Sequence, residues 1–179
     1  MVAYLLVLFA VLSRLMPHAG WWSFTLVGGA LLYFGARRPW KEMLLPLAVL
    51  VTTDCYLTVF KYPGFSIRVD SVFTWGWYLA AMVLGAALLG KRVTLGRGVG
   101  AALLGPTSFF VVSNFGVWLC GGINMYPHTL AGLASCYLAG VPFYRNDLAS
   151  TALVLGVMLG VPALVRRMQP AAMAATAGK

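Results

Sequence analysis

The chain has 179 residues, of which 61% are hydrophobic, and 13 Lys and Arg stand against 4 Asp and Glu, for a net charge of +9. Soluble domains are about 45–50% apolar and about 25% charged, so this composition excludes a soluble globular protein, and it excludes disordered, fibrous and disulfide-rich secreted proteins too. At about 20 residues per span, the length allows about six transmembrane helices and no separate soluble domain. We therefore assign the positive charge to membrane topology and anionic headgroups, and we expect a lipid bilayer and no nucleic acid as partner.

The first three spans are predicted in the N-terminal third of the chain. The first covers residues 2–16, with no basic segment before it and no clear cleavage site after it, so we favour a retained span over a cleaved signal peptide. The second covers residues 21–36 and ends at a charged turn, residues 37–42. The third covers residues 43–60.

The C-terminal part predicts three more spans. The fourth covers residues 72–89 and the fifth residues 98–119, with a basic turn between them. The sixth covers residues 148–165. We expect an all-α fold in which residues 1–168 form a single six-helix membrane domain, followed by a flexible cytoplasmic tail over residues 169–179.

The segment between the fifth and sixth spans is ambiguous. Residues 129–141 are apolar but lie between Pro127 and Pro142. A helix of that length reaches about 20 Å, whereas the hydrocarbon core is about 30 Å thick. We therefore favour a short interfacial or re-entrant helix, with a seventh span as the alternative.

The distribution of basic residues predicts the orientation. With six spans, nine basic residues fall on one side: Arg37, Arg38, Lys41, Lys91, Arg92, Arg97, Arg166, Arg167 and Lys179. Four fall on the other side: Arg14, Lys61, Arg68 and Arg145. The excess predicts that both termini are cytoplasmic. A seventh span would move Arg166 and Arg167 to the outer side.

Three polar residues interrupt the predicted spans at similar depths. Counting 1.5 Å per residue from the inner interface places Arg14 about 20 Å, Asp54 about 18 Å and Asn114 about 24 Å up their helices. Ionisable residues inside a membrane are costly, so an Arg14–Asp54 ion pair is expected. Such a pair is either a structural brace between the first and third spans or the polar floor of an outward-facing pocket.

The predicted outer side is rich in aromatic and polar side chains that could close such a pocket. An aromatic belt at the membrane interface explains many of them without any ligand. The inner turns carry only one aromatic residue, however, and this asymmetry favours a small-molecule site. The candidate ligand contacts, beyond Arg14, Asp54 and Asn114, are His18, Trp118, Tyr126, His128 and Arg145.

Metal or catalytic chemistry has weaker support in the sequence. His18 and His128 lack the accompanying ligands of a metal site, and two isolated histidines are more simply loop residues. Cys55, beside Asp54, could bind a soft metal or contact the ligand, but a small buried residue is the simpler interpretation. No HExxH, GxSxG or phosphate-binding loop is present. We therefore expect no enzyme, no catalytic residue, no metal site and no resident cofactor.

Several sequence motifs resemble those of an uncharacterised family of bacterial six-span membrane proteins. They are residues 113–118 (SNFGVW), 126–133 (YPHTLAGL) and 141–146 (VPFYRN), together with Arg14 before Pro17-His18 and the Thr53-Asp54 step. The predicted architecture also resembles the substrate-binding S-components of energy-coupling-factor (ECF) transporters. This second resemblance rests on the number of spans, the orientation and the outer pocket.

The resemblance to S-components implies a function in the bacterial cytoplasmic (inner) membrane. It implies capture of a vitamin or similar micronutrient from outside, then docking to a transmembrane coupling subunit with ATPases. Some solitary relatives take up cobalamin through a cysteine ligand, a part that Cys55 could play. The first span departs from the pattern, because Ala3 and Ala10 are seven residues apart and form no Ala-x-x-x-Ala docking surface. Alternatives are an accessory subunit of a larger membrane complex and a small membrane enzyme that uses the histidines.

Overall fold

The computed structural model is all-α, and it describes residues 1–15, 24–61, 69–91, 93–121, 125–166 and 168. Within these ranges, four helical segments are long and apolar enough to cross a membrane: Trp40–Lys61, Ser71–Leu89, Leu95–Cys120 and Leu130–Arg166. A shorter apolar helix, Val2–Leu15, precedes them. The chain is therefore a multi-pass membrane protein, as its composition predicts. The predicted tail, residues 169–179, lies outside the described residues.

The N-terminal helices are shorter than a full membrane span. Helix α1 is Val2–Leu15 and helix α2 is Val27–Arg37. The prediction for α2 is wrong at its start, because the helix begins at Val27 and not near residue 21. At 11 residues it rises only about 16 Å, and Gly28 and Gly29 in its first turn weaken helix propensity there.

The third segment joins three helical forms. A 3₁₀ turn, Trp40–Glu42, leads into α3, Leu44–Tyr56, which continues as a π-helical turn, Leu57–Lys61. Pro46 stands in the first turn of α3. Backbone N–H groups in a first turn have no acceptor within the helix, so the N–H that proline lacks is not needed there. The segment matches the predicted third span within a few residues.

The two following helices also match their predicted spans. Helix α4 is Ser71–Leu89 and helix α5 is Leu95–Cys120. Thr94 caps α5, because its hydroxyl accepts a hydrogen bond from the Arg97 backbone N–H at 3.3 Å. Pro106 lies inside α5, as prolines in membrane helices often do.

The C-terminal segment corrects the sequence prediction. Helix α6, Leu130–Leu155, continues through a π-helical turn, Gly156–Gly160, as one helical segment to Arg166. The separate short helix over residues 129–141 and the sixth span over residues 148–165 are therefore one element. Pro142 lies inside this helix and does not end it, since neighbouring groups in membrane helices can accommodate proline.

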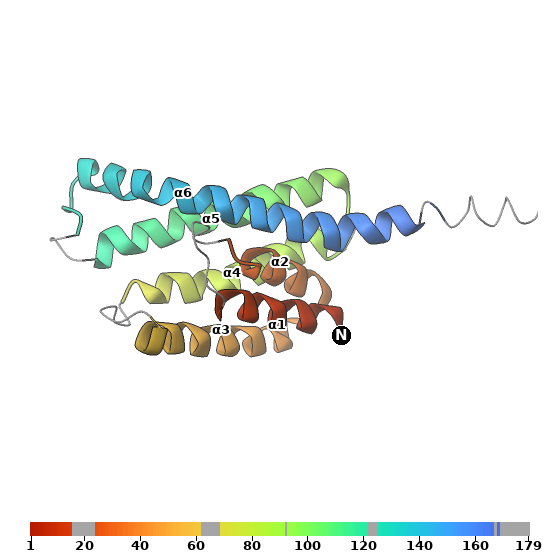
Figure 1. The fold of residues 1–179 in the computed structure, drawn as a ribbon. Coiled ribbons are helices and arrows are strands. Elements are labelled where there is room, and N and C mark those ends of the chain that lie inside the picture. Colours follow the sequence, from red (N-terminus) through yellow and green to blue (C-terminus); the bar gives the residue numbers. More distant parts are fainter. Residues whose placement is uncertain (16–23, 62–68, 92, 122–124, 167, 169–179) are drawn as a thin grey trace, which may run out of the picture.

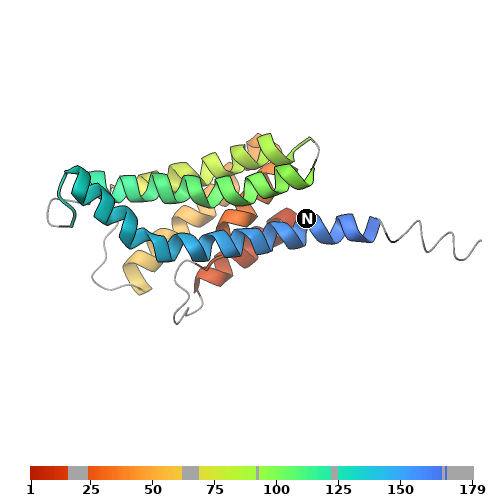
Figure 2. The same ribbon diagram turned by 90° about the horizontal axis from the view of Figure 1, so that it is seen from above.

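The helices form layers (Figure 1), with α5 and α6 on one side, α2 and α4 in the middle, and α1 and α3 on the other side. The C-terminal end of the helical segment Leu130–Arg166 extends beyond the bundle in both views (Figure 2). Two glycines allow α2 and α4 to pack closely. A Cβ on Gly35 would lie 1.8 Å from the Met82 carbonyl oxygen, and one on Gly85 would lie 2.0 Å from the Leu32 carbonyl oxygen. Small residues at such contacts let helix backbones approach in membranes.

Candidate functional site

An ion pair joins the first and third helical segments. Arg14, near the C-terminal end of α1, donates through Nη2 to Oδ1 of Asp54 on α3. Their side chains are only 18% and 16% exposed, respectively. The ion pair expected from depth counting is thus present, and it links residues that are 40 positions apart.

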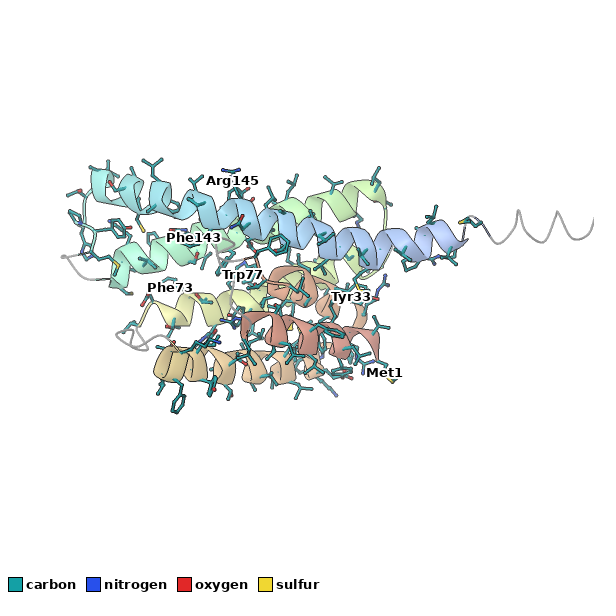
Figure 3. The ribbon with its side chains drawn as sticks, in the orientation of Figure 1. Met1, Tyr33, Phe73, Trp77, Phe143 and Arg145 are labelled. Atoms are coloured by element: carbon teal, nitrogen blue, oxygen red, sulfur yellow. The ribbon has the colours of Figure 1, made fainter. Side chains whose placement is uncertain are left out.

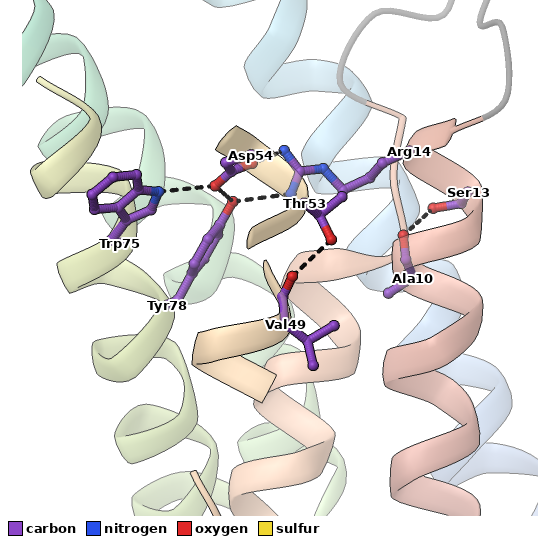
Figure 4. Close-up of polar contacts among 8 residues, drawn as sticks. All are labelled: Ala10, Ser13, Arg14, Val49, Thr53, Asp54, Trp75 and Tyr78. Carbon is purple, nitrogen blue, oxygen red and sulfur yellow. Dashed lines mark hydrogen bonds and ion pairs between the residues drawn. The ribbon is translucent and has the colours of Figure 1, made fainter. Parts of the chain in front are cut away.

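Helix α4 supplies two further partners to the same carboxylate (Figure 4). Trp75 donates through Nε1, and Tyr78 through its hydroxyl, to Oδ2 of Asp54, each at 3.0 Å. Arg14 also donates through Nη1 to the Tyr78 hydroxyl at 3.4 Å. Positions three apart on a helix share a face, which is why both α4 side chains reach Asp54. The network holds α1, α3 and α4 together.

A cavity of about 300 Å³ opens beside this network. It is the first of two cavities that bear on the candidate residues, and we call it the first cavity. Its volume is at the lower end of the range for small-molecule sites, about 300–1,000 Å³. Aromatic rings and a few polar groups line it, as in such sites. The lining residues are Arg14, Thr25, Val27, Gly28, Asp54, Thr58, Ser71, Thr74, Trp75, Trp77, Tyr78, Phe109 and Asp147.

Asp147 is the second carboxylate of the first cavity. It lies inside α6, whereas the sequence predicts a break here between a short helix over residues 129–141 and a sixth span over residues 148–165. The residue is 7% exposed, and its Oδ2 has no hydrogen-bond partner within the described part of the chain. The hydroxyl of Thr151, one turn further along α6, is also buried without a partner there. Both residues face Gly28 of α2, because a Cβ on Gly28 would lie 2.7 Å from Thr151 Oγ1 and 3.3 Å from Asp147 Oδ1.

Asn114 lies in a different cavity from the ion pair. This second cavity, also about 300 Å³, is lined by residues of α5 and α6, with Tyr126 beside them. Asn114 donates through Nδ2 to the Phe110 carbonyl at 2.8 Å. Arg14, Asp54 and Asn114 therefore do not line one cavity, whereas the sequence predicts that they do. The two cavities share only part of their lining, which includes Phe109 and Asp147.

Two other candidates meet at the end of the α5–α6 hairpin. The Trp118 Nε1 donates to the Pro127 carbonyl at 3.0 Å, and its ring packs edge-to-face on His128 with centroids 5.4 Å apart. Neither side chain lines the first or the second cavity. Their contacts close the end of the hairpin, which accounts for them without a ligand.

Cys55 and Arg145 lie apart from the first cavity. Cys55 is half-buried next to Asp54 but lines neither cavity. Arg145 is exposed on α6 and points away from the other helices (Figure 3), so it does not cover the first cavity as a loop residue. His18 lies outside the described residues. Within the ranges that the structure describes, no group of three His, Cys, Asp or Glu side chains could hold a metal ion.

Sequence reasoning missed Tyr78 and the burial of Asp147. The signal for Tyr78 was its spacing of three from Trp75 on a predicted helix, which places both on one face. The signal for Asp147 was its spacing of four from Thr151, which becomes informative only once residues 130–166 form one helix.

The comparisons with known proteins identify a family but no activity. A model of a family of unknown function, DUF6580, matches residues 1–172. No protein with a curated description matches the chain. No solved structure matches it either.

Proposed function

The chain belongs to the family of unknown function DUF6580, and we propose that it is a substrate-binding membrane transport protein, similar to an ECF S-component. It would capture a small micronutrient at the outer side of a bacterial cytoplasmic membrane. Both termini would then be cytoplasmic, as the distribution of basic residues favours.

The observation that carries this proposal is the first cavity with its polar network. Arg14 and Asp54 are costly in a membrane, yet both line a cavity and are not sealed among apolar side chains. A brace alone needs no open space beside it. Fixed hydrogen bonds from Trp75 and Tyr78 to Asp54 also hold the wall in one arrangement before a ligand arrives, which lowers the entropic cost of binding.

The size of the first cavity limits the ligand. Cobalamin, a corrin with an appended nucleotide, is far larger than about 300 Å³. Cys55, the proposed cobalt ligand, does not line this cavity. We therefore propose a ligand with about as many atoms as a small vitamin or a metabolite fragment.

The position of Arg145 indicates that the chain contacts another membrane protein. Such a contact is compatible with transport, and it is also the basis of a second candidate function. It is exposed on α6, about 22 Å along the helix from Leu130. A charge on the lipid-facing surface at such a depth is costly without a counter-charge. A coupling subunit with an acidic residue would supply one in the transport model. In the second candidate function, the chain is an accessory subunit and Arg145 anchors it in a larger complex.

Native mass spectrometry of the chain, purified gently from its own membrane, tests the proposal. We expect a bound small molecule, which should be lost in Trp75→Leu because this change removes a cavity wall and a donor to Asp54. Trp40→Leu is the matched control, since Trp40 is 73% exposed and lies outside the first cavity. A ligand-free chain in a stoichiometric complex with non-ATPase membrane subunits would refute the transport function and support the accessory subunit.

A further inference from the structure

We propose that the first cavity binds a small organic cation and that Asp147 is the residue that selects the positive charge. This inference rests on the proposed function, because it names the substrate class of the same cavity. It depends on three features of the described residues: the charge balance, the aromatic walls and the close approach of α2 to Asp147 at Gly28.

The first cavity carries an uncompensated carboxylate. Among its described lining residues, Arg14, Asp54 and Asp147 are the ones that carry formal charge. Arg14 is already committed to Asp54 and to the Tyr78 hydroxyl. The charge of Asp147 is therefore not balanced within the lining, and an anionic ligand would meet a site without a free cation.

Burial makes that carboxylate a strong determinant of the ligand. Asp147 is 7% exposed and its Oδ2 has no partner in the described ranges. A buried charge without a partner is costly, whereas a positive ligand supplies the missing counter-charge. Binding of a cation therefore offsets the cost of burying the Asp147 charge, whereas a neutral molecule of the same shape supplies no counter-charge.

The aromatic walls favour an organic cation over a metal ion. Trp77 packs against Phe109, with ring centroids 4.6 Å apart, and against Tyr78 at 6.2 Å. The Trp77 Nε1 donates to Ser108 Oγ at 2.9 Å, so its N–H is already satisfied. Rings of this kind attract ammonium groups through their quadrupoles. A metal ion would instead need several close ligands, and no such group is found in the described part of the chain.

Gly28 lets the α2 backbone lie close to Asp147 and Thr151 of α6. A Cβ at this position would lie 2.7 Å from Thr151 Oγ1 and 3.3 Å from Asp147 Oδ1. The absent side chain leaves α2 backbone next to the two polar groups of α6. Thr151 is fully buried and does not line the first cavity, so Asp147 is the member of this pair that a ligand can reach.

The test uses three probes of nearly equal shape and different charge. They are choline, its neutral carbon analogue 3,3-dimethyl-1-butanol, and the anion 3,3-dimethylbutanoate. Binding to the full chain in lipid nanodiscs is measured by calorimetry. We expect choline to bind at least tenfold more tightly than the alcohol and the anion to bind most weakly. This comparison needs no variant, so it does not depend on the folding of a mutant.

Variants then assign the selectivity to a residue. Asp147→Asn should weaken choline binding at least tenfold and leave alcohol binding unchanged. Glu42→Gln is the matched control, because it removes the same charge outside the first cavity, and it should leave both unchanged. Equal binding of choline and the alcohol, tighter binding of the anion, or full choline binding by Asp147→Asn would each overturn the inference.

The two proposals fail in different ways. If the anion or the alcohol binds best, the cationic class is wrong and the binding function stands. If none of the probes binds and native mass spectrometry also finds no bound molecule, both proposals are wrong. If none of the probes binds but an anionic or neutral molecule copurifies, only the cationic class is wrong.

Discussion

The two described ion pairs of this protein differ in what they connect. Arg38 and Glu42 are four residues apart at the end of α2, with Nε–Oε2 at 2.6 Å and Nη2–Oε1 at 2.8 Å. The Tyr4 hydroxyl donates to Glu42 and accepts from Arg38 at 3.1 Å. Hydrogen bonds with Glu42, and then with Tyr4, raise the pKa of Arg38. The other pair, Arg14 and Asp54, joins helices that are far apart in the sequence.

The surroundings of the pairs show which one bears on function. The Arg38 and Glu42 side chains are 32% and 31% exposed, and neither lines the first or second cavity. They fix a local turn and attach α1 to it through Tyr4. Arg14 and Asp54 are about half as exposed and line the first cavity. Similar chemistry thus serves a turn in one region and a candidate binding site in the other.

Breaking the long-range pair should have the largest effect. Asp54→Asn leaves the Arg14 charge partly buried without a counter-charge, which we expect to cost about 3–5 kcal/mol of stability. Chemical denaturation in detergent micelles measures this loss. Wild-type stability in the variant would contradict the role of the pair.

A double substitution separates the brace from the pocket. Arg14→Met with Asp54→Leu removes both charges together, and such apolar replacements are often neutral for stability. We expect part of the lost stability to return, because no unpaired charge remains, although the Trp75 N–H and the Tyr78 hydroxyl still lose their acceptor. Binding of the copurifying ligand should be lost. Retained binding, measured by native mass spectrometry, would make the pair a brace only.

Close packing between α2 and α4 gives the next largest effect. Gly35→Ala places a Cβ 1.8 Å from the Met82 carbonyl oxygen, so the helices must separate, at a cost of about 1–3 kcal/mol or more. Gly100→Ala is the matched control, because nothing lies within 4 Å of its added Cβ. The two thermal unfolding curves should differ clearly. Equal curves would show that the α2–α4 contact is looser than the structure has it.

Asn114→Ala should have a smaller effect. It removes the hydrogen bond to the Phe110 carbonyl, worth about 1 kcal/mol. Because Asn114 lines the second cavity and not the first, ligand affinity should change less than twofold by calorimetry. A larger loss of affinity would show that the ligand occupies both cavities.

Glu42→Gln should have the smallest effect of all. Exposed ion pairs contribute little to stability, and the Gln side chain can still accept from the Tyr4 hydroxyl and from Arg38. We expect unfolding curves and ligand binding that match wild type within error. A change in ligand binding would indicate that the turn communicates with the first cavity.

Depth counting along the predicted spans found the ion pair but misplaced other residues. It succeeded for Arg14 and Asp54 because α1 and α3 begin within a few residues of the predicted starts. It did not predict that Asn114 lines a different cavity, because depth does not tell which way a side chain faces around the helix. Arg145 and Asp147 were misplaced for another reason: the sequence predicts a helix boundary at Pro142, and the structure has one helix there.

The sequence by itself determined the membrane class, the long apolar helices and the need for a partner for each buried charge. These follow from composition and from the cost of charge in lipid. Only the tertiary structure decided that α6 runs through Pro142 and that Trp75 and Tyr78 meet Asp54. It also decided that Asp147 lies beside Gly28 with its Oδ2 unpartnered among the described residues. Those contacts depend on how helices rotate and pack against one another, and local sequence does not specify that rotation.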